Sequence, residues 1–64
     1  MNGSDFSLEN KIILITGASS GLGASTAIEC SKAGAQVIIT GRNQERLNDT
    51  FNKLFGSGHT QIMF

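Results

Sequence analysis

Residues 16–23, which read T-G-A-S-S-G-L-G, carry the residue types in this chain that are best suited to chemistry. Glycines let a backbone turn come close to a bulky anion, because they lack the Cβ atom that would keep it away. A helix beginning within this segment would add free N–H groups and the positive end of its dipole. We expect Gly17 to make the sharp turn, Gly21 to admit phosphate groups and Gly23 to let the helix pack on the sheet. The segment therefore predicts a phosphate-binding turn.

Two other phosphate-binding patterns do not fit this spacing. A P-loop requires a Lys directly after its last glycine, and no Lys follows any of these glycines. The G-x-G-x-x-G dinucleotide pattern would need a glycine at the position of Thr26. The spacing is instead G-x-x-x-G-x-G with Thr16 before it. Ser19 and Ser20, between the glycines, supply hydroxyl groups able to bond phosphate or ribose.

The segments around this turn alternate between strand and helix patterns. Residues 11–16 and 36–40 are short apolar runs rich in β-branched side chains, which predicts strands buried on both faces. Residues 22–33 and 44–55 predict helices, and residues 60–64 have the pattern of a third strand. The order βαβαβ predicts an α/β fold with a parallel three-stranded sheet.

The two predicted helices differ in the faces that they turn toward the sheet. The helix over 22–33 has an inward face of small residues, which suits close packing: Gly23, Ala27, Cys30 and Gly34. Gly34 also suits the C-terminal cap of this helix. The helix over 44–55 begins after Asn43 as its N-cap and has a larger apolar face for the core: Leu47, Phe51, Leu54 and Phe55. We also expect an ion pair between Asp49 and Lys53 on its solvent side.

One face of the predicted sheet has no cover. Right-handed crossovers between neighbouring strands place both helices on the same face. The other face then carries Ile, Leu and Val side chains, whereas parallel sheets are normally covered on both faces. The chain also stops inside the apolar run at residues 62–64. We therefore expect a truncated half of a doubly wound parallel sheet, completed by more chain or by a partner.

Composition narrows the class of protein. Five basic and five acidic residues give a net charge of zero, which offers no electrostatic case for binding nucleic acid or an anionic membrane. One Cys and one His exclude an internal disulfide and the usual Cys/His zinc sites. No apolar run is long enough to span a membrane, and residues 1–7 are expected to form a flexible polar arm without a signal-peptide core. We expect a cytoplasmic protein, with Cys30 a small buried residue and His59 at the surface.

The octapeptide at residues 16–23 resembles the T-G-x-x-x-G-x-G coenzyme-binding motif of the short-chain dehydrogenase/reductase family, and it matches at all four fixed positions. The resemblance extends over residues 8–64 and implies the N-terminal part of a Rossmann-like dinucleotide-binding domain several times longer than this chain. It implies an oxidoreductase that interconverts a carbonyl and an alcohol by hydride transfer and that is commonly a homo-oligomer. The candidate cofactor-binding positions are Gly17, Ser19, Ser20, Gly21, Leu22, Gly23 and Arg42.

The end of the second predicted strand bears on the choice of cofactor. Members of the family that bind NAD typically carry an Asp there, which bonds the ribose hydroxyls. Gly41 occupies that place in this chain, and Arg42 follows it. An Arg gives a 2′-phosphate charge-assisted hydrogen bonds, whereas a carboxylate would repel it. These residues favour NADP over NAD, although the basic residue that often precedes the second glycine in NADP-binding members is replaced by Ser20.

The residues that perform the chemistry in this family have no counterpart in the chain. The resemblance implies a Tyr as general acid/base, with a Lys four residues later, and the chain contains no Tyr. We therefore assign no catalytic residue and expect this segment alone to be inactive. The small alcohol or carbonyl substrate would bind to parts of the protein that these residues do not include. The alternative hypothesis is a non-catalytic nucleotide-binding or interaction fragment that needs a partner to cover its sheet.

Overall fold

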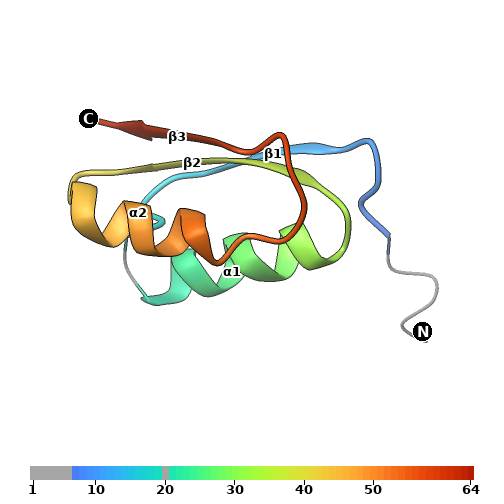
Figure 1. The fold of residues 1–64 in the computed structure, drawn as a ribbon, viewed down its shortest axis with the longest axis horizontal. Coiled ribbons are helices and arrows are strands. Elements are labelled where there is room, and N and C mark those ends of the chain that lie inside the picture. Colours follow the sequence, from blue (N-terminus) through green and yellow to red (C-terminus); the bar gives the residue numbers. More distant parts are fainter. Residues whose placement is uncertain (1–6, 20) are drawn as a thin grey trace.

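The computed structural model describes residues 7–19 and 21–64, and in this part a parallel three-stranded sheet alternates with two helices (Figure 1). The elements are β1 (Ile12–Ile15), α1 (Gly21–Lys32), β2 (Gln36–Gly41), α2 (Gln44–Asn52) and β3 (Thr60–Met63). The strand order is β1-β2-β3, so that β2 lies in the centre, and both helices lie on one face of the sheet. This confirms the predicted Rossmann-like half-sheet. In the described part, neither helix is long and apolar enough to cross a membrane.

The covered face of the sheet is built from every second residue of β1 and β2. Ile13 pairs with Val37 and Ile15 with Ile39, and partners in a parallel ladder point to the same face. Val37 and Ile39 are completely buried, as is Leu47, which packs against them from α2. Burial of these branched side chains supplies most of the favourable energy that holds the two layers together.

The opposite face of the sheet is open, as the sequence predicts. Ile12 is 68% exposed, Leu14 is 60% exposed and Ile62 on β3 is 50% exposed. Both helices lie on the other side of the sheet (Figure 1), so neither covers this face. Apolar side chains gathered on one surface in this way mark a face that normally receives a cover.

Helix α1 approaches the sheet through small residues. Ala27 and Ser31 are buried on its inner face, and Cys30 packs against the core with part of its surface exposed. Gly34 is exposed and does not belong to this face, contrary to one part of the prediction, but it follows the helix with a φ of 102°, as expected of a C-terminal cap. This left-handed conformation ends the helix and turns the chain into β2.

Helix α2 begins as predicted but ends earlier. The side-chain Oδ1 of Asn43 accepts a hydrogen bond from the Arg46 N–H at 3.0 Å, which confirms the N-cap. The helix ends at Asn52, with Lys53 as its C-cap, so that the following residues leave the helical face. The prediction that Phe55 is a core residue is therefore wrong: it is 52% exposed, and the Nζ of Lys32 lies 5.3 Å from its ring centroid.

The predicted ion pair between Asp49 and Lys53 does not form. Lys53 is the C-cap of α2, and its N–H donates to the Thr50 carbonyl at 3.0 Å. Within the described residues, the ion pair joins Glu29 and Lys32 on α1 at 3.3 Å. Both side chains are largely exposed, and such pairs contribute little to stability.

His59 has a structural role that its sequence position does not predict. Its Nδ1 accepts a hydrogen bond from the Val37 N–H at 3.0 Å, and its Nε2 lies 2.6 Å from the carbonyl oxygen of Phe55. Because Nδ1 accepts, Nε2 carries the hydrogen and donates a hydrogen bond to the Phe55 carbonyl oxygen. The side chain thus satisfies a backbone N–H of β2 just before β3 begins to pair at Thr60. His59 is partly exposed, in keeping with the predicted surface position, but the sequence did not predict that its ring bridges the central strand and the loop after α2.

We expect His59→Ala to destabilise the protein by about 2 kcal/mol, because it leaves the Val37 N–H, in a buried residue, without its acceptor. Urea unfolding with a constant m-value would measure the change. His59→Asn is the matched variant, since an amide oxygen can accept the same hydrogen bond, and it should recover part of the loss. Equal midpoints for His59→Ala and the parent protein would show that the bridge contributes nothing.

Candidate functional site

The glycine-rich turn connects the end of β1 to the start of α1 and is anchored through Ala18. Gly17 has a φ of 70°, a conformation that side-chain-bearing residues rarely adopt, and it makes the sharp exit from the strand as predicted. Ala18 is completely buried. Its N–H donates to the Thr40 carbonyl at the end of β2, and its own carbonyl accepts from the Thr50 Oγ1 of α2, both at 2.9 Å. The turn is therefore held by two other elements of the fold.

Gly23 lets the first turn of α1 lie directly against the glycine-rich turn. A Cβ atom at this position would lie 2.6 Å from the carbonyl oxygen of Gly17 and 3.2 Å from the Cα atom of Ala18. Both neighbours are backbone atoms of an anchored segment, so they cannot move away easily. The prediction that Gly23 lets the helix pack on the sheet is therefore corrected: the close approach at Gly23 is to the turn itself.

Gly21 faces open space at the start of α1. A Cβ atom placed there would meet no described atom within 4 Å outside its chain neighbours and its own helix backbone. Helix α1 begins at this residue, so its first N–H groups have no partner within the helix, and its first turn carries no acidic side chain. The open space and the positive end of the helix dipole together form a cradle that suits an anion.

Two of the predicted site residues add little detail to this cradle. Leu22 lies in the first turn of α1 and its side chain is 83% exposed. An apolar side chain cannot bond an anion, so only the backbone N–H of Leu22 could contribute to the cradle. Ser20 lies outside the described residues. Ser19, by contrast, is half-buried, and its side chain lies beside Gly41 at the end of β2.

Arg42 lies at the same edge of the sheet as the turn. It follows the last residue of β2 and is exposed, with its guanidinium carbon 5.9 Å from the centroid of the Phe64 ring. Phe64 is held beside it because its N–H donates to the Gly41 carbonyl at 3.0 Å. Stacking on an aromatic face restrains a long cationic side chain. The structure thus brings Gly17, Ser19, Gly21, Gly23 and Arg42 to one edge, where the carboxyl ends of the strands meet.

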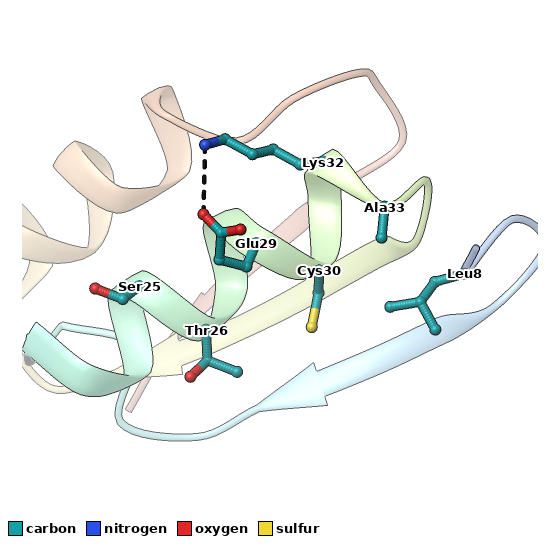
Figure 2. Close-up of a pocket in the computed structure, with 7 residues that line it drawn as sticks. All are labelled: Leu8, Ser25, Thr26, Glu29, Cys30, Lys32 and Ala33. Carbon is teal, nitrogen blue, oxygen red and sulfur yellow. Dashed lines mark hydrogen bonds and ion pairs between the residues drawn. The ribbon is translucent and has the colours of Figure 1, made fainter. Parts of the chain in front are cut away.

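A hollow of about 560 Å³ lies away from the turn, along the flank of α1 (Figure 2). Thr26 and Cys30 project from the helix toward it, Leu8 faces them, and the ion pair of Glu29 with Lys32 lies on the helix above (Figure 2). None of the predicted site residues that the structure describes lines this hollow. Its surface is mainly apolar, the Thr26 hydroxyl donates to the Leu22 carbonyl, and Lys32 is paired with Glu29, so the candidate site remains the edge that carries the turn.

Comparison with known proteins decides the family. The family model described as short chain dehydrogenase matches residues 11–64, which include the turn, both helices and all three strands. The chain belongs to the short chain dehydrogenase family. Among curated relatives, the uncharacterized oxidoreductase YvrD of Bacillus subtilis is 43% identical over 54 residues, which are 84% of this chain and 20% of that protein.

Solved structures of short chain dehydrogenases share the half-sheet. A protein of Escherichia coli CFT073 described as a short chain dehydrogenase, complexed with NADPH, has a TM-score of 0.80 and 35% identity over 92% of this chain and 26% of its own. A short-chain type dehydrogenase/reductase of Mycobacterium marinum has a TM-score of 0.78 and 35% identity over the whole of this chain and 26% of its own. This short chain dehydrogenase segment therefore spans about a fifth to a quarter of the proteins that it matches.

Sequence reasoning missed the residues that position the turn. Thr50 lies on the inner side of α2 among apolar residues, and a polar side chain on an apolar face is the signal that could have indicated its hydrogen bond. Ala18, as the buried anchor of the turn, has no comparable signal. The contact of Phe64 with Arg42 depends on two strand ends that are distant in sequence, so no local pattern predicts it.

We expect Gly23→Ala to destabilise the protein by about 2 kcal/mol, because its Cβ atom would overlap the Gly17 carbonyl oxygen. Gly21→Ala is the matched control in the same helical turn, and its Cβ atom would enter open space. Thermal unfolding should show a clear loss of Tm for the first variant and none for the second. A similar Tm for both variants would contradict the close approach at Gly23.

Proposed function

We propose that this chain is the N-terminal cofactor-binding segment of an NADP(H)-dependent short-chain oxidoreductase that interconverts a carbonyl and an alcohol. The observation that carries the proposal is the open cradle at Gly21, which lies at the start of α1 and shares one edge of the sheet with Arg42. A dinucleotide needs an anion site for its diphosphate and a recognition site for its ribose, and this edge offers both. Residues 8–64 then form the beginning of the dinucleotide-binding domain.

The residues of the turn have separate roles in this proposal. The space at Gly21 and the free N–H groups of the first turn of α1, including that of Leu22, receive the diphosphate. The hydroxyl groups of Ser19 and Ser20 bond phosphate or ribose. Gly17 and Gly23 act indirectly, since they give the backbone the shape that leaves the cradle open.

The edge of β2 favours NADP(H) over NAD(H). Gly41 provides no carboxylate for the ribose hydroxyls, whereas Arg42 next to it is exposed and restrained by the Phe64 ring. A guanidinium forms charge-assisted hydrogen bonds with a phosphate, and here it would meet the 2′-phosphate. The NADPH bound to the similar protein of Escherichia coli CFT073 supports the same choice.

Catalysis itself belongs to a part of the protein outside this chain. When bound, NADP(H) carries the hydride that is exchanged with a small alcohol or carbonyl substrate. The described residues bind and orient the adenosine and diphosphate end of the cofactor, and we assign none of them a catalytic role. The proposed full-length protein is a cytoplasmic homo-oligomer.

We expect Arg42→Asp in the full-length protein to lower kcat/KM for NADPH roughly thirtyfold, which corresponds to about 2 kcal/mol for a lost charge-assisted contact. The value for NADH should change much less, because NADH has no 2′-phosphate. Steady-state kinetics with both cofactors would give the ratio of the two kcat/KM values.

Lys53→Asp is the control for this experiment, since it makes the same change of charge at the opposite end of α2. It should leave the ratio unchanged. An equal shift in both variants would mean that Arg42 acts through the general field of the protein rather than through the 2′-phosphate. A ratio that does not move in Arg42→Asp would remove Arg42 from the proposed site, and failure to bind either cofactor would overturn the proposed function.

A further inference from the structure

The loop between α2 and β3 is tied to both layers of the fold through a chain of hydrogen bonds. The Ser31 Oγ of α1 donates to the Ile28 carbonyl at 2.7 Å and accepts from the Phe55 N–H at 3.0 Å. The Phe55 carbonyl oxygen in turn lies 2.6 Å from the Nε2 of His59. The chain of bonds ends on β2, where the Val37 N–H donates to the His59 Nδ1 at 3.0 Å. His59 is therefore the link between a loop that is held on α1 and the central strand.

The two contacts of the His59 ring are compatible with the neutral imidazole alone. The backbone N–H of Val37 can only donate, so Nδ1 must keep its lone pair. The backbone carbonyl of Phe55 can only accept, so Nε2 must carry the hydrogen. A second proton would turn Nδ1 into a donor and set it against the Val37 N–H. Because Val37 is completely buried, the loss of this acceptor leaves a backbone group unsatisfied.

The surroundings of the ring do not compensate it for a second proton. Strands β2 and β3 carry no charged side chain. The charged residues of the loop and of the last turns of α1 and α2 are Glu29, Lys32, Asp49 and Lys53. Among the described residues, no carboxylate forms an ion pair with His59, and Glu29 is paired with Lys32 instead. The Lys32 ammonium lies over the ring of Phe55, so the charge next to the His59 partner has the same sign as an imidazolium.

We propose that His59 is a proton-sensitive latch, which holds the start of β3 on β2 while its ring is neutral and releases it when Nδ1 takes up a proton. Pairing of the two strands begins directly after the latch, at Thr60 opposite Ile38. Protonation breaks the bond from Val37 and leaves the bond to Phe55 intact, so the loop stays on α1 while β3 loosens. Histidine is the side chain whose charge normally changes between pH 5 and 8. The unfolded chain binds this proton freely, so the latch is closed at pH 8 and weakens as the pH falls.

Backbone hydrogen exchange in the full-length protein tests the latch. His59→Asn is the matched variant, because its amide oxygen can accept from the Val37 N–H and does not titrate. The exchange rate of the parent divided by that of His59→Asn should rise about tenfold from pH 8 to pH 5 in peptides that cover Val37 and the start of β3. Comparison at equal pH removes the intrinsic pH dependence of exchange. His59→Ala, which has no acceptor at any pH, should keep a constant ratio to His59→Asn.

Two measurements on the parent protein alone complete the test. Peptides from α2 serve as an internal reference, and the rates at Val37 and at the start of β3 should rise relative to them by the same factor. NMR spectra of the ring nitrogens of His59 at pH 8 should show the hydrogen on Nε2 and a bare Nδ1. Both results can be obtained even if neither variant folds.

Each outcome has a defined meaning. Faster exchange at low pH that is confined to β2 and β3, together with a hydrogen on Nε2 at pH 8, supports the latch. A constant exchange ratio, an equal rise in the α2 peptides, or a hydrogen on Nδ1 at pH 8 would overturn it. None of these results depends on a cofactor, so a protein that binds no dinucleotide would refute the proposed function and leave the latch standing.

Discussion

The pair of hydrogen bonds at Ala18 is the constraint on which the candidate site depends. One bond fastens the turn to the end of β2 and the other fastens it to α2, so three elements meet at a single buried residue. This anchor fixes the positions of the candidate site residues on either side of Ala18. Position 23 has no room for a side chain because the anchored turn beside it cannot move away. Ser19 stays against the end of β2 for the same reason. A buried backbone group that lost its partner here would cost energy and disturb the whole edge.

The sheet and the turn could be predicted from the sequence because their signals are local. Branched apolar runs of strand length predicted β1 and β2, and the glycine spacing predicted both the turn and the start of α1 within a residue or two. The same local reasoning identified Asn43 as the N-cap of α2. In each case the residues that carry the signal are the residues that form the structure.

The failures have a common physical origin in contacts between distant segments. Phe55 fits the apolar periodicity of α2, but the helix ends before it, and the residue then meets Lys32 of another helix. His59 is an ordinary loop residue by its neighbours in sequence, and only the register of β3 against β2 places its ring beside the Val37 N–H. The contact of Ser19 with Gly41 is hidden in the same way, because Ser19 reaches it across the fold.

The uncovered sheet face also affects how readily the chain associates with other chains while it folds. Strands that are neighbours in the sheet are neighbours in sequence, so this unit can assemble early from short-range connections. Its open face displays Ile12, Leu14 and Ile62 to the solvent. Apolar surface that stays exposed during folding promotes association between chains. The same topology that lets this unit form early therefore makes its open face prone to such association.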